Sequence, residues 1–255
     1  MQKLRGLSSY KAQPVKRVWI EKPGKPDLRP LGIPTLYDRA VQALCLFALD
    51  PLAETSADMR SFGFRVGRSS HDAVEYLRLL CGARYGKRHV LEVDIRKFFD
   101  RISHDWILKH VPLNKHLLRE FLKAPICDTR AKSEEINALG VPQGGVISPL
   151  IANYALDGLE TLVSSVRGCF FVRYADDFVV VGNSAEDLTQ VRSFVDAFLA
   201  ERGLACHPDK TGLTTIEDGF DFLGFHMKEF KDPNRTGGQK LGILLIQPTA
   251  SNIRR

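Results

Sequence analysis

The amino-acid sequence predicts an α+β fold, in which an antiparallel β-sheet of the split β-α-β arrangement is covered by helices on one face. Two β-rich runs within residues 170–182 predict a β-hairpin, and another β-rich run precedes it at residues 89–95. Helical patterns occur at residues 148–159 and 184–203, one before and one after the hairpin. The order strand, helix, hairpin, helix, strand is typical of a sheet with helices packed against it.

The segment before this sheet contains both extended and helical patterns. Residues 14–34 are expected to be extended, because five prolines forbid a long helix and the run VKRVWIE favours a strand. Apolar residues then follow helical spacing from Thr35 onward. The Gly-punctuated run at residues 61–68 is expected to form a loop, and Ser70 is expected to cap a second helix that ends at Gly82.

The remaining elements are predicted from local signals of the same kind. A short helix is expected after Ser103, whereas residues 123–145 are polar and are expected to be irregular. Ser148 and Pro149 are typical of a helix start, and the apolar pattern behind them continues through Leu159. Further short strands are predicted at residues 204–207, 220–226 and 241–247.

Charge is distributed unevenly along the 255 residues. Lys and Arg number 36 against 30 Asp and Glu, which gives a formal net charge of +6 at pH 7. Residues 1–36 hold eight basic and two acidic groups, so the rest of the chain is balanced. A basic leading segment on a neutral body indicates a polyanionic partner, nucleic acid first, although a solvated basic tail would have the same composition.

Composition excludes several classes of protein. With 44% hydrophobic and 26% charged residues, the chain is typical of globular proteins rather than disordered ones. No apolar run approaches the roughly 18 residues of a membrane span, and the first residues lack the apolar core of a secretory signal. The five cysteines lie far apart without a C-x-x-C pair. This spacing argues against a disulfide framework or a zinc site and favours a reducing, cytoplasmic interior.

Three carboxylates occur at positions where a charge needs an explanation. Asp94 follows an apolar strand, and Asp176 and Asp177 lie at the predicted hairpin tip. Local explanations exist, since Asp is common at strand ends and in turns. In the split β-α-β topology, however, the first strand and the hairpin can be neighbours, which would bring Asp94 and Asp176 together. Two convergent carboxylates can bridge a pair of divalent ions for in-line phosphoryl transfer, and Mg²⁺ is the expected ion.

These residues belong to a series of motifs that resembles the reverse transcriptases encoded by group II introns. Tyr174-Ala175-Asp176-Asp177 resembles the Y/F-x-D-D box of that family. EVDIRKFFDRISHDWIL (92–108) resembles its first catalytic motif, and VPQGGVISPLIANYALDGLE (141–160) is similar to its PQG motif. Residues 16–42 and 61–74 resemble the finger motifs of the family, and residues 207–211 and 220–225 resemble its last palm motifs. All of these motifs occur in the order that the family has.

The resemblance implies a polymerase-type palm with a finger subdomain. Most of the family's N-terminal extension, together with its thumb and maturase region, would lie outside this chain, so weak synthesis is expected. The implied division is fingers at residues 1–88, palm with the first catalytic strand at 89–110, a fingers/palm connection at 111–147, palm again at 148–247, and the start of a thumb at 248–255.

The resemblance also implies roles for single residues of the palm. Asp94 and Asp176 would bind the metal ions with help from the backbone carbonyl of Ile95, and Asp177 would lie beside the metals as the second aspartate of the box. Phe99 would be the gate that excludes a ribose 2′-OH by steric clash. One of the two adjacent phenylalanines, at positions 98 and 99, is expected to be a core residue.

Residues of the finger and late palm motifs would contact nucleotide and nucleic acid. Lys22 and Arg29 would bind the incoming triphosphate through charge-assisted hydrogen bonds. The turn between them is one residue longer than in the family, so Lys25 could replace Lys22. Gln143 would lie beside the nascent base pair. The resemblance further implies nucleic-acid contacts for Arg65, Gly144 and Lys210.

The implied function is that of an RNA-directed DNA polymerase of a mobile element. It would extend a primer 3′-OH on an RNA template, using deoxynucleoside triphosphates and two Mg²⁺ ions. Its partners would be the RNA template, a DNA or RNA primer, and intron RNA. Two alternatives stay open: an RNA-binding, maturase-like remnant without polymerase activity, and a retron, diversity-generating or CRISPR-associated reverse transcriptase.

Overall fold

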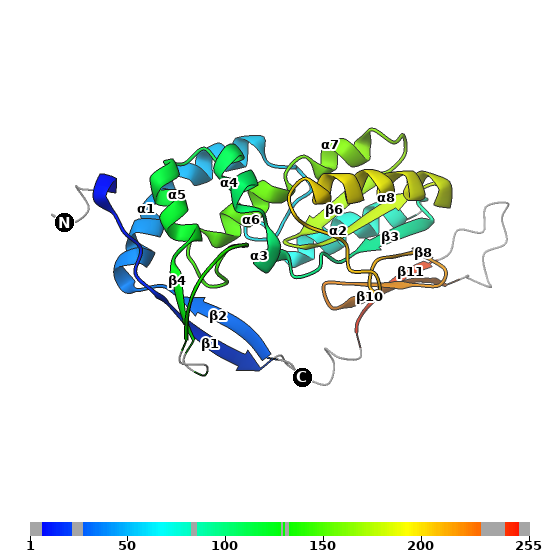
Figure 1. Ribbon diagram of the computed structural model, residues 1–255. Coiled ribbons are helices and arrows are strands. Elements are labelled where there is room, and N and C mark those ends of the chain that lie inside the picture. Colours follow the sequence, from blue (N-terminus) through cyan, green and yellow to red (C-terminus); the bar gives the residue numbers. More distant parts are fainter. Residues whose placement is uncertain are drawn as a thin grey trace, which may run out of the picture. The chain divides into compact units, whose positions relative to one another are not determined.

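The computed structural model describes residues 7–21, 28–82, 86–128, 130, 133–230 and 243–249 (Figure 1). The chain divides into two compact units, each assembled from separate stretches of sequence. The first unit comprises residues 1–57, 97–156 and 201–204, and the second comprises residues 58–96, 157–200 and 205–255. These boundaries differ from the finger and palm division implied by the motifs, and that division stays a prediction.

A four-stranded sheet belongs to the first unit, in the order β2-β1-β4-β5. β1 (Val15–Glu21) pairs antiparallel with β2 (Leu28–Ile33) and parallel with β4 (Pro125–Asp128), and β4 pairs antiparallel with β5 (Ser133–Ile136). The extended prediction at residues 14–34 is confirmed where that segment is described. The prediction of irregular structure at residues 123–145 is wrong for β4 and β5, because β4 pairs with β1, a segment remote in sequence, and β5 pairs with β4.

The helices of the first unit begin at recognisable caps. α1 (Leu36–Ser56) starts after Thr35, whose side chain accepts a hydrogen bond from the Asp38 backbone N–H at 3.2 Å. This start and the short helix after Ser103 are confirmed. Among the described residues, no helix is both long and apolar enough to span a membrane. The other helices of this unit are η2 (Leu7–Ser9), α3 (Phe98–Arg101), α4 (His104–His110), α5 (Lys115–Leu122) and α6 (Ser148–Leu156).

The second unit is built on a four-stranded antiparallel sheet in the order β6-β7-β3-β8. β6 (Phe170–Tyr174) and β7 (Asp177–Gly182) form the predicted hairpin. β3 (His89–Val93) lies between β7 and β8 (Gly212–Thr215), so the first strand and the hairpin are neighbours, as the split β-α-β topology requires.

Helices cover the sheet of the second unit. α7 (Leu159–Ser164) and α8 (Ala185–Ala200) contact each other and lie along one face of the sheet (Figure 1). The opposite face packs against α2 (Ser70–Cys81). Because side chains alternate between the two faces of a strand, alternate residues reach each layer. The buried side chains on the α2 face include Val90, Val172, Val179 and Val181.

Three helix boundaries differ from the prediction, and α8, predicted to run to residue 203, ends at Ala200. The cap of α2 is Ser69 rather than Ser70, because Ser69 and Asp72 form a reciprocal capping box. The helix predicted to continue through Leu159 instead ends at Leu156, and α7 follows as a separate helix. Gly158 interrupts it with a φ of 99°, a conformation outside the right-handed helical region.

The C-terminal strands also differ in detail. The strand predicted at residues 220–226 is divided into β9 (Phe220–Phe222) and β10 (Phe225–Phe230), because the residues between them have positive φ. β10 also pairs with β11 (Ile243–Pro248). The prediction of a strand at residues 204–207 is wrong, because only Cys206 of this segment forms a β-bridge, with Ile95. A turn that begins at His207 follows and separates this bridge from the pairing of β8 with β3.

Candidate active site

The paired ends of β3 and β7 bring two aspartates to the same face of a sheet. Val93 on β3 lies opposite Phe178 on β7. The next pair in this register is Asp94 and Asp177, and directly opposed residues point to the same face. A cavity of about 210 Å³ lies at that face, and its lining includes Glu92, Asp94, Asp177, Val179, Lys210 and Asp221.

Asp176 lies at the tip of the β6–β7 hairpin, directly before Asp177. Tyr174 pairs with Asp177, so the hairpin loop consists of Ala175 and Asp176. Ala175 has a φ of 57°, in the left-handed region that tight hairpin loops use. Asp176 is half-buried and Asp177 is exposed. The three predicted carboxylates therefore gather at one end of the sheet, with Asp177 rather than Asp176 opposite Asp94 in register.

Asp94 is held by the turn that contains the HPDKT motif. The Lys210 Nζ atom lies 2.7 Å from Asp94 Oδ2. The Asp94 carbonyl accepts hydrogen bonds from the His207 N–H at 2.7 Å and from Thr211 Oγ1 at 3.3 Å. Ile95, the next residue, is buried. Lys210 thus balances the charge of one carboxylate of the cluster.

Negative charge nevertheless accumulates at this face. The pKa of the Asp177 carboxyl is raised to about 6, first because the surrounding walls remove part of its hydration, and then because Asp176 and Asp94 carry like charges. Lys210 opposes this rise. A cation near Asp177 would offset the like charges of Asp94 and Asp176.

The donor atoms at this face fit Mg²⁺, which prefers oxygen ligands. The carboxylates of Asp94, Asp176 and Asp177 and the carbonyl of Ile95 could supply them. Among the described residues, no three His, Cys, Asp or Glu side chains are close enough to form a metal site by themselves. Mg²⁺ commonly completes its coordination with water and substrate phosphates. By donor type alone, these carboxylate and carbonyl oxygens fit Mg²⁺.

A larger cavity, of about 410 Å³, lies within the first unit. Phe99 and Gln143 both line it. Phe99 is half-buried, whereas its neighbour Phe98 is a core residue with 3% of its surface exposed. Of the two phenylalanines, Phe99 is therefore the one that a ligand can contact. The cavity wall also includes Arg17, Trp19, Pro30 and Asp100.

The loop that carries Gln143 and Gly144 is braced by two elements. The Gln143 carbonyl accepts a hydrogen bond from the Gly32 N–H on β2 at 2.5 Å. The Val146 N–H donates to Gln42 Oε1 on α1 at 2.7 Å. A Cβ atom on Gly144 would lie 2.5 Å from the Gly32 carbonyl oxygen, and the φ of Gly144 is 113°. Glycine is therefore required at this position by both space and backbone conformation.

The residues predicted to bind the triphosphate are only partly described. Lys22 and its alternative Lys25 lie outside the described residues. Arg29 is exposed on β2, opposite Ile20 of β1. Arg29, Phe99, Gln143 and Gly144 belong to the first unit, whereas the three aspartates belong to the second.

Arg65 holds its own loop together. Its guanidinium donates hydrogen bonds to the backbone carbonyls of Asp58 at 2.5 Å and Ser61 at 2.9 Å. These contacts stay within the segment that precedes α2. Arg65 therefore has a local structural role, and its predicted contact with nucleic acid stays a prediction.

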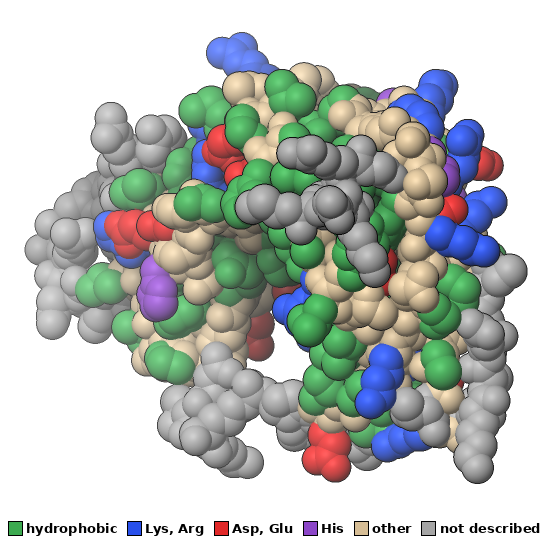
Figure 2. All heavy atoms as spheres, turned by 90° about the vertical axis from the view of Figure 1, so that its left-hand side faces the viewer, with side chains coloured by type: hydrophobic (Ala, Val, Ile, Leu, Met, Phe, Trp, Pro, Cys, Tyr) green, Lys and Arg blue, Asp and Glu red, His purple; other side chains and the backbone are tan. Residues whose placement is uncertain are grey.

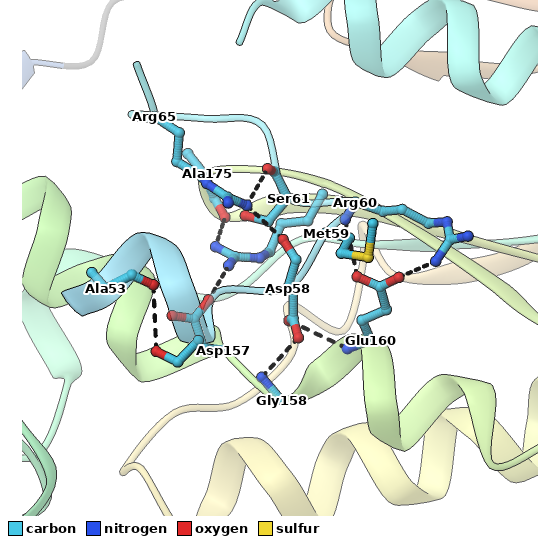
Figure 3. A network of polar contacts seen from close by, with 12 residues as sticks. Ala53, Asp58, Met59, Arg60, Ser61, Arg65, Asp157, Gly158, Glu160 and Ala175 are labelled. Atoms are coloured by element: carbon cyan, nitrogen blue, oxygen red, sulfur yellow. Dashed lines mark hydrogen bonds and ion pairs between the residues drawn. The ribbon is translucent and has the colours of Figure 1, made fainter. Parts of the chain in front are cut away.

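The motifs did not predict a buried ion pair beneath the hairpin. Arg173 of β6 is fully buried, and its Nη2 atom lies 3.0 Å from Asp157 Oδ1. Burial raises the pKa of Asp157 to about 6 and lowers that of Arg173, and each charge partly offsets the shift of the other. Figure 3 shows Asp157 with Asp58 and Glu160 in this network. The only sequence signal was an arginine inside the apolar run FFVRY, since a buried charge needs a partner.

Residues 20–227 match a protein family described as reverse transcriptase (RNA-dependent DNA polymerase). Protein YkfC of Escherichia coli K12 is 33% identical over an alignment of 290 positions, which covers 95% of this chain and 74% of that protein. Group II intron-encoded protein LtrA of Lactococcus lactis subsp. cremoris is 33% identical over 165 residues, which cover 62% of this chain and 27% of that protein. Maturase-like protein 1 of Euglena gracilis is 26% identical over 202 residues, which cover 77% of this chain and 41% of that protein.

A solved structure of telomerase from Candida albicans has the same fold. It was determined in complex with a TWJ fragment of telomeric RNA, and it superposes with a TM-score of 0.65 at 16% identity, covering 96% of this chain and 46% of the telomerase chain. This likeness confirms the predicted α+β fold of a polymerase-type palm with fingers. Because the family match covers most of the sequence, the chain belongs to the reverse transcriptase (RNA-dependent DNA polymerase) family, and its relatives include group II intron-encoded proteins.

Proposed function

We propose that this chain is an RNA-directed DNA polymerase of the group II intron type, which extends a primer 3′-OH on an RNA template. One observation carries the proposal: Asp94 and Asp177 line one cavity at the paired ends of β3 and β7, with Asp176 at the adjoining hairpin tip. Carboxylates repel RNA phosphates unless cations lie between them. A cluster of three is therefore suited to catalysis with metal ions and unsuited to simple RNA binding.

The palm residues would position the reacting groups. Asp94, Asp176 and Asp177, with the Ile95 carbonyl, would hold two Mg²⁺ ions, and Asp177 is the one that lies opposite Asp94 in register. When bound there, the ions would activate the primer hydroxyl and stabilise the departing pyrophosphate. Lys210, which pairs with Asp94, would balance part of the negative charge of the cluster.

The residues of the first unit would recognise the nucleotide and the template. Phe99 would exclude ribonucleotides by occupying the space of a 2′-OH, and Gln143 would lie beside the nascent base pair. This assignment is supported by their common cavity. Lys22, or Lys25 in its place, would bind the triphosphate together with Arg29. The partners would be an RNA template, a DNA or RNA primer, deoxynucleoside triphosphates and intron RNA.

A second candidate function is RNA binding of the maturase kind without polymerisation. The relatives support this second candidate, because they include a group II intron-encoded protein and a maturase-like protein. The chain spans only 27% and 41% of these two relatives, so the activities of the whole proteins do not transfer directly. A retron, diversity-generating or CRISPR-associated system would use the same chemistry and would be identified from neighbouring genes.

Primer extension on poly(rA)/oligo(dT) with dTTP and Mg²⁺ separates the two functions. The wild-type chain is expected to extend the primer, and Asp176→Ala to lower the rate about 10³-fold or more, since it removes a metal ligand. Asp105→Ala, an exposed aspartate at the start of α4, is the matched control and is expected to keep the rate. Equal background rates for wild type and Asp176→Ala, with RNA binding retained in both, would refute the polymerase function and support the RNA-binding one.

A further inference from the structure

Arg173 is a fully buried cation beneath the hairpin that carries Asp176 and Asp177. It lies in β6, two residues before Ala175, and none of its side chain is exposed. A buried guanidinium destabilises a fold strongly unless it is paired and hydrogen-bonded. Its contacts therefore explain why an otherwise apolar strand contains a charge.

The guanidinium of Arg173 connects the hairpin tip to Asp157. Nη1 donates a hydrogen bond to the Ala175 carbonyl at 3.2 Å, and Nη2 donates to Asp157 Oδ1 at 3.0 Å. Ala175 has a φ of 57°, in the left-handed region, where a residue other than glycine is strained. The hydrogen bond from Arg173 thus stabilises a turn conformation that the backbone alone does not favour.

The segment that bears Asp157 is itself fixed. The Asp58 carboxylate accepts hydrogen bonds from the N–H groups of Gly158 at 3.0 Å and Glu160 at 3.3 Å (Figure 3). The Glu160 carboxylate pairs with the Arg60 guanidinium and also accepts a hydrogen bond from the Arg60 N–H at 2.9 Å. The start of α7 and the segment before α2 are therefore joined next to Asp157.

The same segment also covers the outer edge of β6. The Arg173 N–H donates to the Arg60 carbonyl at 3.0 Å, and the Phe62 N–H donates to the Arg173 carbonyl at 2.8 Å. Gly63 packs so tightly that a Cβ atom there would lie 2.2 Å from the backbone nitrogen of Ala175. The backbone at Gly63 thus packs against the hairpin tip, and the Arg173 guanidinium donates a hydrogen bond to the Ala175 carbonyl of the same tip.

We propose that Arg173 is a positioning residue for the acidic site. By fixing the Ala175 carbonyl, it sets the direction in which Asp176 and Asp177 leave the hairpin tip. The inference rests on the proposed function, in which these aspartates bind metal ions. Groups that orient metal ligands typically change metal affinity or activity about 10- to 100-fold when they are removed.

Two measurements on Arg173→Met, Arg173→Lys and Asp157→Asn test this role. The first is hydrogen–deuterium exchange of the hairpin tip, residues 174–178, and the second is the Mg²⁺ concentration that gives half-maximal incorporation of one nucleotide. Arg173→Met is expected to speed exchange at the tip and to raise the Mg²⁺ requirement about tenfold. Arg173→Lys is expected to restore part of both, because it keeps the charge but lacks the fork that reaches two partners.

Arg192→Met is the matched control, because it removes an arginine from the outer surface of the same unit, where it pairs with Asp196. It is expected to leave both quantities unchanged. Unchanged exchange at residues 174–178, or an unchanged Mg²⁺ requirement, in folded Arg173→Met would overturn the inference. If Arg173→Met does not fold, Asp157→Asn decides by the same two readouts. If the wild-type chain incorporates no nucleotide, the proposed function fails, and the exchange measurement still decides whether Arg173 holds the hairpin.

Discussion

At the scale of single residues, identical side chains differ in what their neighbours allow them to do. Asp94 and Asp177 line a cavity, and a ligand can reach both. Asp58 is 7% exposed, and its oxygens are occupied by two backbone N–H groups. The first two carboxylates are therefore available for chemistry, and the third stabilises a turn.

The gate assigned to Phe99 leads to a prediction about sugar selection. Phe99→Val is expected to raise the incorporation of ribonucleotides relative to deoxyribonucleotides about tenfold, because a smaller side chain leaves space for a 2′-OH. The ratio of the two kcat/KM values measures this effect. Phe47→Val on α1, where the side chain is 78% exposed, is the control. An unchanged ratio in Phe99→Val would remove Phe99 from the gate.

The sequence could predict which carboxylates gather at the hairpin end of the sheet, but not the ion pair beneath them. Asp94, Asp176 and Asp177 stand out because they lie at the ends of apolar runs within motifs that resemble those of a known family. Asp157 shows no such local signal. It is recognised only when the fold brings it to within 3.0 Å of Arg173, whose own partner cannot be deduced from spacing.

At the scale of elements, the predicted and observed N-caps of α2 differ by one residue, since the prediction was Ser70 and the structure has Ser69. Ser69→Ala is expected to lower the free energy of unfolding of the second unit by about 1 kcal/mol, because it removes the capping box with Asp72. Ser70→Ala, the change at the residue that the pattern favoured, is expected to have a much smaller effect. Urea denaturation followed by circular dichroism compares the two variants. Equal losses would contradict the capping box.

Elements with strong local signals could be predicted, and those that depend on distant partners could not. The β6–β7 hairpin, β3 and α1 follow from apolar periodicity and caps within their own segments. β4 is a strand because it pairs with β1, and nothing within its four residues indicates that partner. The division into β9 and β10 depends on two consecutive residues with positive φ, one of which is Leu223, a residue type that rarely adopts that conformation.

At the scale of the whole molecule, the net positive charge of +6 comes from the first 36 residues of the sequence, and the remaining residues are balanced. The face in Figure 2 carries Lys and Arg side chains scattered among hydrophobic and acidic ones. A basic leading segment would contribute to RNA binding through the release of counterions, and this contribution weakens as salt rises.

The salt dependence of RNA binding tests this placement. Replacing exposed Lys11 and Lys16 by Gln is expected to reduce the slope of log K against log salt by about 1.4, since each phosphate contact on a single strand contributes about 0.7. Replacing Lys109 and Lys123, which are also exposed, removes the same charge from elsewhere in the chain. Fluorescence anisotropy with a labelled RNA gives both slopes. An equal reduction in the two double variants would show that charge acts without regard to position.

We propose that the carboxylates at the paired ends of β3 and β7 support metal-dependent nucleotidyl transfer on an RNA template. The most direct test of this central claim is the rate of incorporation of one dTMP on poly(rA)/oligo(dT), measured against Mg²⁺ concentration for wild type and Asp94→Asn. We predict a saturable Mg²⁺ dependence in wild type and a rate about 10³-fold lower in Asp94→Asn, with unchanged binding of primer and template. The same rate and the same Mg²⁺ dependence in both proteins would contradict the claim.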